Sequence, residues 1–191
     1  SLHSAIGSIK VGATLSIGNY LAVPLMAEFM AQHPGTQVSL DVANTRQIVS
    51  ELLDFQLDIG LIEGEINHPQ LQVETWMDDE LAVFCHPNHP LATLQAQARG
   101  ISLDDVIAQP WIVREQGSGT RQAFERAFHG HLPDLHILLE LQHTEAIKRA
   151  VEAQMGIGCL SRITLQDAFS RGRLVQLHLP QLNLERTLYL A

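Results

Sequence analysis

The chain has 191 residues, 46% of them apolar, and its 12 lysines and arginines against 21 aspartates and glutamates give a net charge of −9. Binding to nucleic acid or to an anionic membrane needs basic surface that displaces counterions, so the charge argues against both partners for these residues. No apolar run approaches the roughly 20 residues that cross a bilayer, and residues 1–4 show no secretion signal. Cys85 and Cys159 lie inside apolar runs and are too few for a disulfide framework. We expect reduced core thiols, which favour a cytoplasmic location.

The first third of the chain alternates short β-rich runs with helical apolar patterns. The pattern predicts strands at 9–14, 38–43 and 57–62 and helices at 19–32 and 46–55, with Pro24 either in the first helical turn or at a kink. Parallel strands joined by helices form a doubly wound, Rossmann-like α/β layer. Ligands of such sheets bind beyond the carboxyl ends of the strands, which directs attention to the segment after Thr14.

A second α/β alternation follows. Predicted strands at 71–77 and 81–86, separated by three acidic residues, precede a break at 87–90. The later elements are a helix at 103–108, a strand at 111–113, a helix at 120–128, a strand at 135–141, a helix at 145–153, a strand at 157–160 and β character at 174–179 and 184–190. Two similar halves predict an α/β fold of two lobes joined by two crossover strands, with lobe I at 1–80 plus 162–191 and lobe II at 81–161. A cleft between lobes is a preferred small-molecule site.

Two segments join a predicted strand to a helix with the residues of an anion site. In the run from Thr14 through Ser16, Ile17 and Gly18 to Asn19, free N–H groups and hydroxyls suit an anion or a carboxylate. Simple capping of the helix by Ser16 or Asn19 explains the same residues.

The second segment runs from Arg114 to Arg121. Its glycines let the backbone curl, and its hydroxyls open a helix; the residues concerned are Gly117, Ser118, Gly119 and Thr120. This arrangement suits a small oxyanion or carboxylate, but it lacks the spacing of a P-loop, and a plain capped helix remains possible.

Thr144 and Glu145 open a third helix in the corresponding position of the second half. Glu145 either faces a ligand, where it would prefer a donor group or a protonated acid, or simply favours the helix dipole in the first turn.

Metal and catalytic motifs are not indicated. The closest histidine pairs, His86 with His89 and His129 with His131, lack the cysteines or carboxylates of a zinc site. Ser118 has no identifiable base partner, and a nucleophile needs one within hydrogen-bond reach. We therefore predict no catalytic residue, no metal and no cofactor.

An ordered set of short motifs extends over the chain. They are Ile6-Gly7-Ser8-Ile9-Lys10-Val11-Gly12-Ala13-Thr14, His33-Pro34-Gly35, Leu57-Asp58-Ile59-Gly60, His89-Pro90-Leu91-Ala92, and Ala150-Val151-Glu152-Ala153 followed by Met155-Gly156-Ile157-Gly158. Together they resemble the effector-binding domain of LysR-type transcriptional regulators. The resemblance implies a type 2 periplasmic-binding-protein fold, with an effector held in the cleft between the lobes.

The resemblance also implies partners. The effector would be a small oxyanion or carboxylate, held by Thr14, Ser16, Ile17, Gly18, Asn44, Thr45, Gly117, Ser118, Gly119, Thr120, Thr144 and Glu145. The domain would form homodimers or tetramers, with the first helix and second strand of one lobe against the helix after Thr120 of the partner. DNA would be bound only by an N-terminal winged helix-turn-helix outside these residues.

One position departs from the family pattern, and two other functions stay open. Gln154 stands where a helix-ending glycine is usual, so either it adopts a left-handed conformation at about 1 kcal/mol or the helix ends differently. A solute-binding protein of a transporter would share the fold, and a small α/β enzyme would need a base–nucleophile pair or a metal set.

Overall fold

The computed structural model describes residues 7–191, which divide into two compact units. Unit 1 contains residues 7–78, 117–119 and 187–191 of the described chain, and unit 2 contains residues 79–116 and 120–186. Ile6, with which the first strand motif was expected to open, lies outside the described residues. No helix within residues 7–191 combines the length and the apolar character that a bilayer crossing needs.

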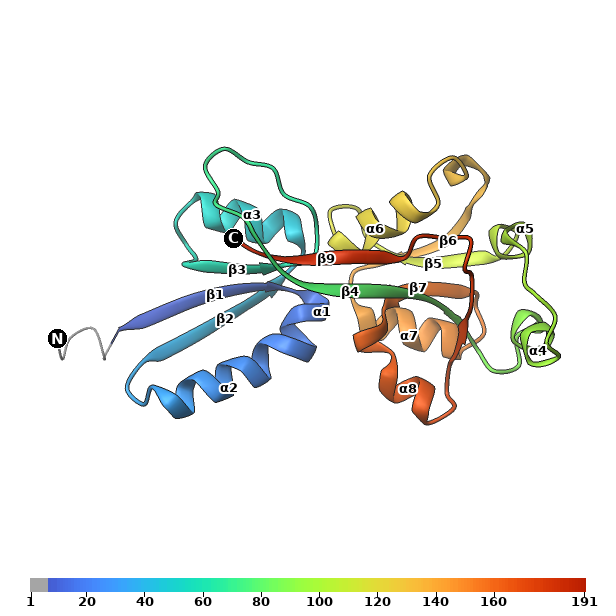
Figure 1. The fold of residues 1–191 in the computed structure, drawn as a ribbon, viewed down its shortest axis with the longest axis horizontal. Coiled ribbons are helices and arrows are strands. Elements are labelled where there is room, and N and C mark those ends of the chain that lie inside the picture. The colour runs from blue at the N-terminus through green and yellow to red at the C-terminus, as the bar shows by residue number, and fades with distance from the viewer. Residues whose placement is uncertain (1–6) are drawn as a thin grey trace. The chain divides into compact units, whose positions relative to one another are not determined.

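Unit 1 is a small parallel sheet with a helix on each side (Figure 1). Its elements are β1 (Ser8–Thr14), α1 (Leu15–Ile17), the π-helical turn η2 (Gly18–Ala22), α2 (Val23–Gln32), β2 (Gln37–Ala43), α3 (Thr45–Leu53) and β3 (Ile59–Ile62). β1 pairs in parallel with both β2 and β3, and the end of β9 (Glu185–Leu190) pairs antiparallel with β3. The predicted strand–helix order is confirmed, but the first helical run begins at Leu15 instead of Asn19.

The two faces of the unit 1 sheet differ in how well they are covered. Ile48 and Leu52 lie one helical turn apart on α3 and pack with Leu57 and Ile62 in one core cluster. On the other face, Val11, Ala13, Ile17, Ala22, Leu61 and Leu188 form a second cluster. None of the residues of α2 is buried, and Pro24 lies in the first turn of α2, which was one of the two placements expected for it.

Unit 2 is a larger sheet with helices on both faces (Figure 1). Its elements are β4 (Glu74–Cys85), α4 (Pro90–Ala96), α5 (Leu103–Ile107), β5 (Pro110–Arg114), α6 (Gly119–Ala127), η3 (Leu132–Asp134), β6 (His136–Leu141), α7 (Thr144–Glu152), β7 (Ile157–Ser161), η4 (Arg162–Thr164), α8 (Gln166–Ser170) and β8 (Val175–Leu177). β5 is parallel to β6 and β7, and β4 is antiparallel to β7 and β8. β4 and β9 each contain residues of both units, so they are the two crossover strands. The first lies where it was expected, but the second was expected near Leu160, in β7 (Ile157–Ser161), which lies wholly in unit 2.

An aromatic cluster anchors one face of the unit 2 core. The rings of Trp111, Phe124 and Phe128 lie 5.1–5.2 Å apart between centroids and are almost fully buried. Cys85 and Cys159 are buried and form no disulfide, as predicted. Burial raises the pKa of both thiols to about 12, because a thiolate would be desolvated there.

Three sequence expectations need correction. The two strands expected around residues 78–80 are one continuous strand, β4, because the carboxylate of Asp79 is paired inside unit 2 with Arg186 and does not need solvent. Residues 162–186, which we expected in lobe I, lie in unit 2, where β8 pairs with β4 and Leu174 enters the core. Conversely, residues 117–119 lie in unit 1.

The break expected at residues 87–90 is a turn, and it leads directly into a helix that was not predicted, α4. Nδ1 of His89 accepts a hydrogen bond from Leu91 N at 3.0 Å, and Nε2 lies 3.1 Å from Oε1 of Gln109. The ring is therefore neutral, with its proton on Nε2. Burial lowers the pKa of His89, and the hydrogen bond to Gln109 opposes that shift only in part.

The end of α7 resolves the question raised by Gln154. This residue has φ 63°, with Gln154 N bonded to Val151 O and Met155 N bonded to Ala150 O. That pair of bonds is a Schellman motif, so a non-glycine residue occupies the left-handed position. Phe55 has φ 58° at the same position after α3.

Candidate functional site

The carboxyl ends of the parallel strands in unit 1 lie at one edge of the sheet. β1 ends at Thr14, β2 at Ala43 and β3 at Ile62. The residues that continue these strands therefore gather at that edge, which is where α/β sheets bind ligands. They are Leu15 and Ser16 after β1, Asn44 and Thr45 after β2, and Glu63 after β3.

Hydroxyl groups at this edge are buried without partners. Thr14 is 1% exposed and Ser16 is 3% exposed, and Oγ1 of Thr14, Oγ of Ser16 and Oγ1 of Thr45 make no hydrogen bond to any described residue. The alternative of simple helix capping by Ser16 or Asn19 is wrong, because Thr14 is the N-cap residue and its side chain makes no capping bond. A buried hydroxyl without a partner costs about 1–3 kcal/mol, which a bound polar group would offset.

The other expected residues of this segment contribute differently. The side chain of Ile17 is 1% exposed and belongs to the apolar core, and a Cβ on Gly18 would crowd Val42. These two positions can therefore offer a ligand only main-chain groups. Asn44 caps α3, with its side-chain oxygen 3.0 Å from Gln47 N, so this part of the amide is already engaged.

The loop at residues 117–119 packs against the same edge of unit 1. Arg46 N donates to Gly117 O at 3.3 Å, and a Cβ on Gly119 would collide with the main-chain oxygen of Glu63. Gly117 has φ 94°, which an L side chain rarely adopts. The two glycines are thus required by a left-handed turn and by a close backbone contact, and they place the buried Ser118 in unit 1.

Sequence reasoning missed Glu63. Its side chain is 2% exposed, and Oε1 accepts a hydrogen bond from Ser16 N at 3.2 Å. Its position in the sequence could have indicated it, because Glu63 follows β3 directly. Ligands of α/β sheets bind beyond the carboxyl ends of the strands, and this holds after β3 as it does after Thr14.

The corresponding region of unit 2 contains a buried ionic network. Nε of Arg186 lies 2.8 Å from Oδ2 of Asp79, and both side chains are 3% exposed. Oγ of Ser161 donates to Oδ1 of Asp79 at 3.0 Å, and Nη1 of Arg186 donates to the hydroxyl of Thr120 at 3.4 Å. Thr120 is therefore held by an arginine that the sequence pattern did not single out. Arg114, at the end of β5, is 1% exposed and its Nε bonds Glu115 at 2.8 Å.

Thr144 and Glu145 differ in accessibility. Thr144 is 3% exposed, and its Oγ1 has no hydrogen-bond partner within the described part of the chain. The side chain of Glu145 is 58% exposed and pairs with Nζ of Lys148 at 3.2 Å, in the first turn of α7. This geometry favours the helix-dipole interpretation for Glu145. Lys148 also donates to Thr164 O at 2.7 Å.

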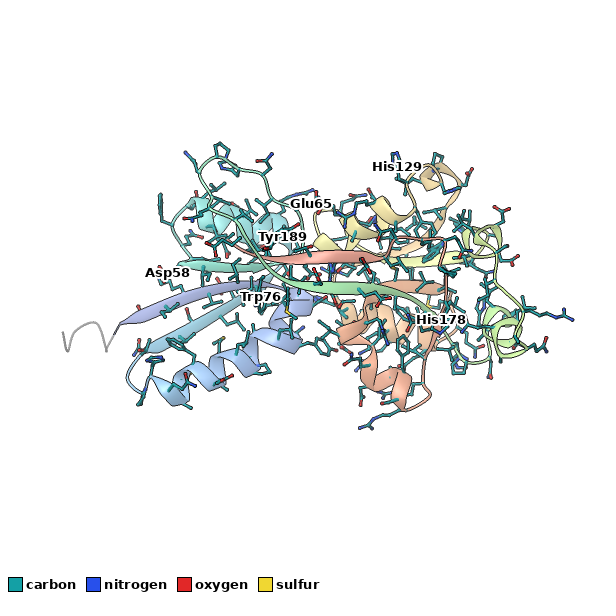
Figure 2. The ribbon with its side chains drawn as sticks, in the orientation of Figure 1. Asp58, Glu65, Trp76, His129, His178 and Tyr189 are labelled. Carbon is teal, nitrogen blue, oxygen red and sulfur yellow. The ribbon has the colours of Figure 1, made fainter. Side chains whose placement is uncertain are left out.

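His86 and His89 have local structural roles, and His129 is simply exposed. Nδ1 of His86 accepts from Asn88 N at 2.9 Å, His89 caps α4, and His129 is exposed near the end of α6 (Figure 2). Among residues 7–191, no three side chains of His, Cys, Asp or Glu gather as a possible metal site.

Two α/β units that share two strands define the class of protein, a ligand-binding domain of the type 2 periplasmic-binding-protein fold. The regulatory domain of CcmR from Synechocystis PCC6803, solved in complex with 2-PG, has this architecture. It superposes with a TM-score of 0.85 and 31% identity, covering 96% of this chain and 86% of that chain. The predicted fold class is confirmed.

The LysR substrate binding domain family matches residues 3–191, and the chain belongs to this family. It is 39% identical over 184 residues to the HTH-type transcriptional regulator YeiE of Escherichia coli (strain K12), covering 96% of this chain and 61% of that protein. It is 30% identical over 186 residues to the HTH-type transcriptional regulator CysL of Bacillus subtilis (strain 168), covering 97% of this chain and 61% of that protein. The chain thus spans about three fifths of the length of these relatives.

These relatives are named as regulators of transcription. This supports the prediction of a regulatory, non-enzymatic domain and gives no support to the alternatives of a transporter's solute-binding protein or a small enzyme. The individual effector residues, and the position of the effector between the lobes, stay predictions.

Proposed function

We propose that this domain senses a small effector for a DNA-binding regulator of transcription, and that the effector contacts the strand ends of both units. Its relatives in the LysR family support the regulatory role, and the CcmR domain in complex with 2-PG supports a small anionic effector. The contact residues in this proposal are the twelve that the family resemblance implies, with the main chain alone for Ile17 and Gly18. DNA is contacted through a helix-turn-helix outside these residues, in the cytoplasm.

The buried hydroxyls carry this proposal. Thr14, Ser16, Thr45 and Thr144 each follow or end a strand at a carboxyl edge, and each has a buried hydroxyl oxygen without a partner in residues 7–191. Folded proteins rarely leave such groups unsatisfied, and the exceptions call for a ligand, a water or strain. A polar effector would supply the missing hydrogen bonds.

Calorimetric titration tests the site. The panel contains 2-phosphoglycolate, sulfate, phosphate and a set of small carboxylates, and a binder should raise the unfolding temperature of the domain by mass action. A Ser118→Ala, Thr120→Ala double variant should weaken binding of any binder by at least about tenfold. Ser50→Ala, an exposed position on α3, serves as the control. Affinity unchanged in the double variant would remove those hydroxyls from the site.

We further propose that the domain self-associates through α2 and β2, which form one side of a dimer contact against α6 of the partner. In support, α2 has no buried residue, and Val23, Leu25, Met30 and Val42 are exposed apolar side chains on these two elements. Sedimentation equilibrium should show a Leu25→Asp, Met30→Asp double variant dissociating at concentrations where the parent chain is a dimer. Phe55→Asp, which changes an apolar side chain 93% exposed outside these elements, should leave the dimer intact. Equal masses for the parent and the double variant would refute the contact.

A further inference from the structure

Glu63 is a buried carboxylate inside the proposed effector region of unit 1. It follows β3 directly, it is 2% exposed, and its Oε1 accepts from Ser16 N at 3.2 Å, across 47 residues of sequence. The loop at residues 117–119 fixes its main chain, since Gly119 lies against the Glu63 carbonyl too closely for any side chain. Glu63 is thus held at the edge of the sheet through its main chain by the loop and through its carboxylate by Ser16 N.

Glu63 accepts from Ser16 N, and this main-chain donor is the one that an anionic effector would be expected to use. Ser16 N belongs to the first turn of a helical run in which α1, η2 and α2 follow one another without interruption. Main-chain N–H groups at such a position attract negative charge. In this chain, the negative charge is supplied by the protein itself.

The neighbouring hydroxyls show what remains for a ligand. Oγ1 of Thr14 and Oγ of Ser16 are buried on the short segment that bonds this carboxylate through Ser16 N, and neither hydroxyl has a partner in the described chain. A hydroxyl can donate to a ligand or accept from it, whereas an ionised carboxylate can only accept. A fully ionised oxyanion placed here would meet a like charge at short range in a region shielded from water.

We propose that Glu63 is a specificity-determining residue, which selects an effector that presents a hydrogen-bond donor to unit 1 and discriminates against oxyanions that carry no proton. The donor is a hydroxyl, a protonated acid oxygen or an ammonium group. This inference rests on the proposed effector-binding function. It refines the expectation of a simple anion site after Thr14, because the acidic part of the effector would then contact groups other than Ser16 N.

Phosphate and sulfate are the probes that distinguish a site that requires a hydrogen-bond donor from a site that accepts any small oxyanion. At neutral pH both are tetrahedral oxyanions of similar size, but phosphate retains a P–OH donor and sulfate has none. Calorimetry on the 191-residue chain should show phosphate binding at least about tenfold more tightly than sulfate, because a buried acceptor strongly rejects an analogue that lacks the donor. Glu63→Gln should abolish this preference and strengthen sulfate binding, since the amide can donate and removes the charge.

The control is Glu65→Gln, which makes the same change of charge two residues away at an exposed side chain (Figure 2). It should retain the preference for phosphate. Circular dichroism and thermal unfolding verify that each variant is folded. If the parent chain binds neither probe, acquired sulfate binding in Glu63→Gln supports the proposal, and its absence overturns it.

Two further results would overturn it. One is sulfate binding to the parent chain as tightly as phosphate; the other is a preference that survives in Glu63→Gln. Either result would leave the effector-binding function intact, provided that a member of the carboxylate and 2-phosphoglycolate panel binds. Failure of the function itself would instead appear as no binding across that panel and no effect of the Ser118→Ala, Thr120→Ala substitutions.

Discussion

The two units have the same type of parallel sheet edge but opposite buried chemistry. In unit 1 the edge carries neutral hydroxyls without partners and one carboxylate, Glu63. In unit 2 the buried residues include three cations, Arg114, Arg186 and Lys148, and each has an oxygen partner within unit 2. Removing the partner of a buried charge is costly, whereas removing a hydroxyl that has no partner breaks no hydrogen bond. The comparison therefore indicates that the paired charges of unit 2 maintain structure, while the hydroxyls of the unit 1 edge, and Thr144 in unit 2, are available for a ligand.

The largest expected effect comes from breaking the network in unit 2. Asp79→Ala removes the carboxylate that faces Arg186 and should lower the free energy of unfolding by about 3–5 kcal/mol, because a buried guanidinium loses its counter-charge. Urea unfolding followed by circular dichroism measures this. Glu80→Ala breaks the adjacent exposed pair with Arg162 and should cost at most about 1 kcal/mol. Equal costs for the two variants would contradict a structural role for the buried network.

The next effect tests whether the loop at residues 117–119 belongs to unit 1. Gly119→Ala forces a Cβ against the main chain of Glu63 and Gly64, which should cost about 1–3 kcal/mol by overpacking and weaken effector binding. Gly100→Ala is the matched control, because a Cβ there meets no atom within 4 Å among the residues described. Thermal unfolding of both variants decides the point, and an unchanged Gly119→Ala protein would show that the loop can lie elsewhere.

Two serines sharpen the contrast between the units. Ser161→Ala removes a donor to Asp79 and an acceptor for Ile163 N, so it should cost about 1–2 kcal/mol. Ser16→Ala removes an unpartnered buried hydroxyl and should leave the unliganded domain equally stable or more stable by up to about 1 kcal/mol. The two changes are chemically identical, so their difference in unfolding free energy reports the environments. A loss of stability at Ser16 would remove the basis for assigning its hydroxyl to a ligand.

His89 gives a smaller, pH-dependent effect in unit 2. Because burial lowers its folded-state pKa below the ordinary value, the neutral ring contributes stability above about pH 6.5, and this is lost as the pH falls through the folded pKa. His89→Ala should cost about 1 kcal/mol at neutral pH and less in acid. Ser102→Ala, which removes the hydroxyl cap of α5, should cost a similar amount at both pH values. A His89→Ala cost that does not change with pH would contradict the neutral-ring assignment.

The smallest effect concerns the left-handed residue that follows a helix in each unit. Gln154→Gly in unit 2 and Phe55→Gly in unit 1 relieve left-handed strain after a helix, and each should stabilise its unit by about 0.5–1 kcal/mol. Gly172 already fills such a position at φ 72°, so Gly172→Ala should destabilise by a similar amount. Unfolding temperatures give the sign of each change, and opposite signs at the first two positions would show that packing outweighs strain.

Much of the fold could be predicted from the sequence because its signals are local. Apolar periodicity located β1, α3, β5 and α7 to within a few residues. The glutamine in place of a helix-ending glycine indicated either a left-handed residue or a different helix end, and the φ of 63° at Gln154 shows that the first applies. The predictions failed where a distant partner changed the meaning of a local signal. Three acidic residues looked like a break in β4, but Arg186 neutralises the middle one from 107 residues away.

The candidate site likewise depends partly on local signals in the sequence and partly on distant partners. The sequence by itself determined which segments end strands and open helices, and hence most of the polar residues at the two sheet edges. Only the tertiary structure decided that residues 117–119 join unit 1, that residues 162–186 stay in unit 2, and that Glu63 bonds Ser16 N. The physical reason is that secondary structure follows from neighbours along the chain, whereas the partner of a buried charge is set by where the whole chain folds.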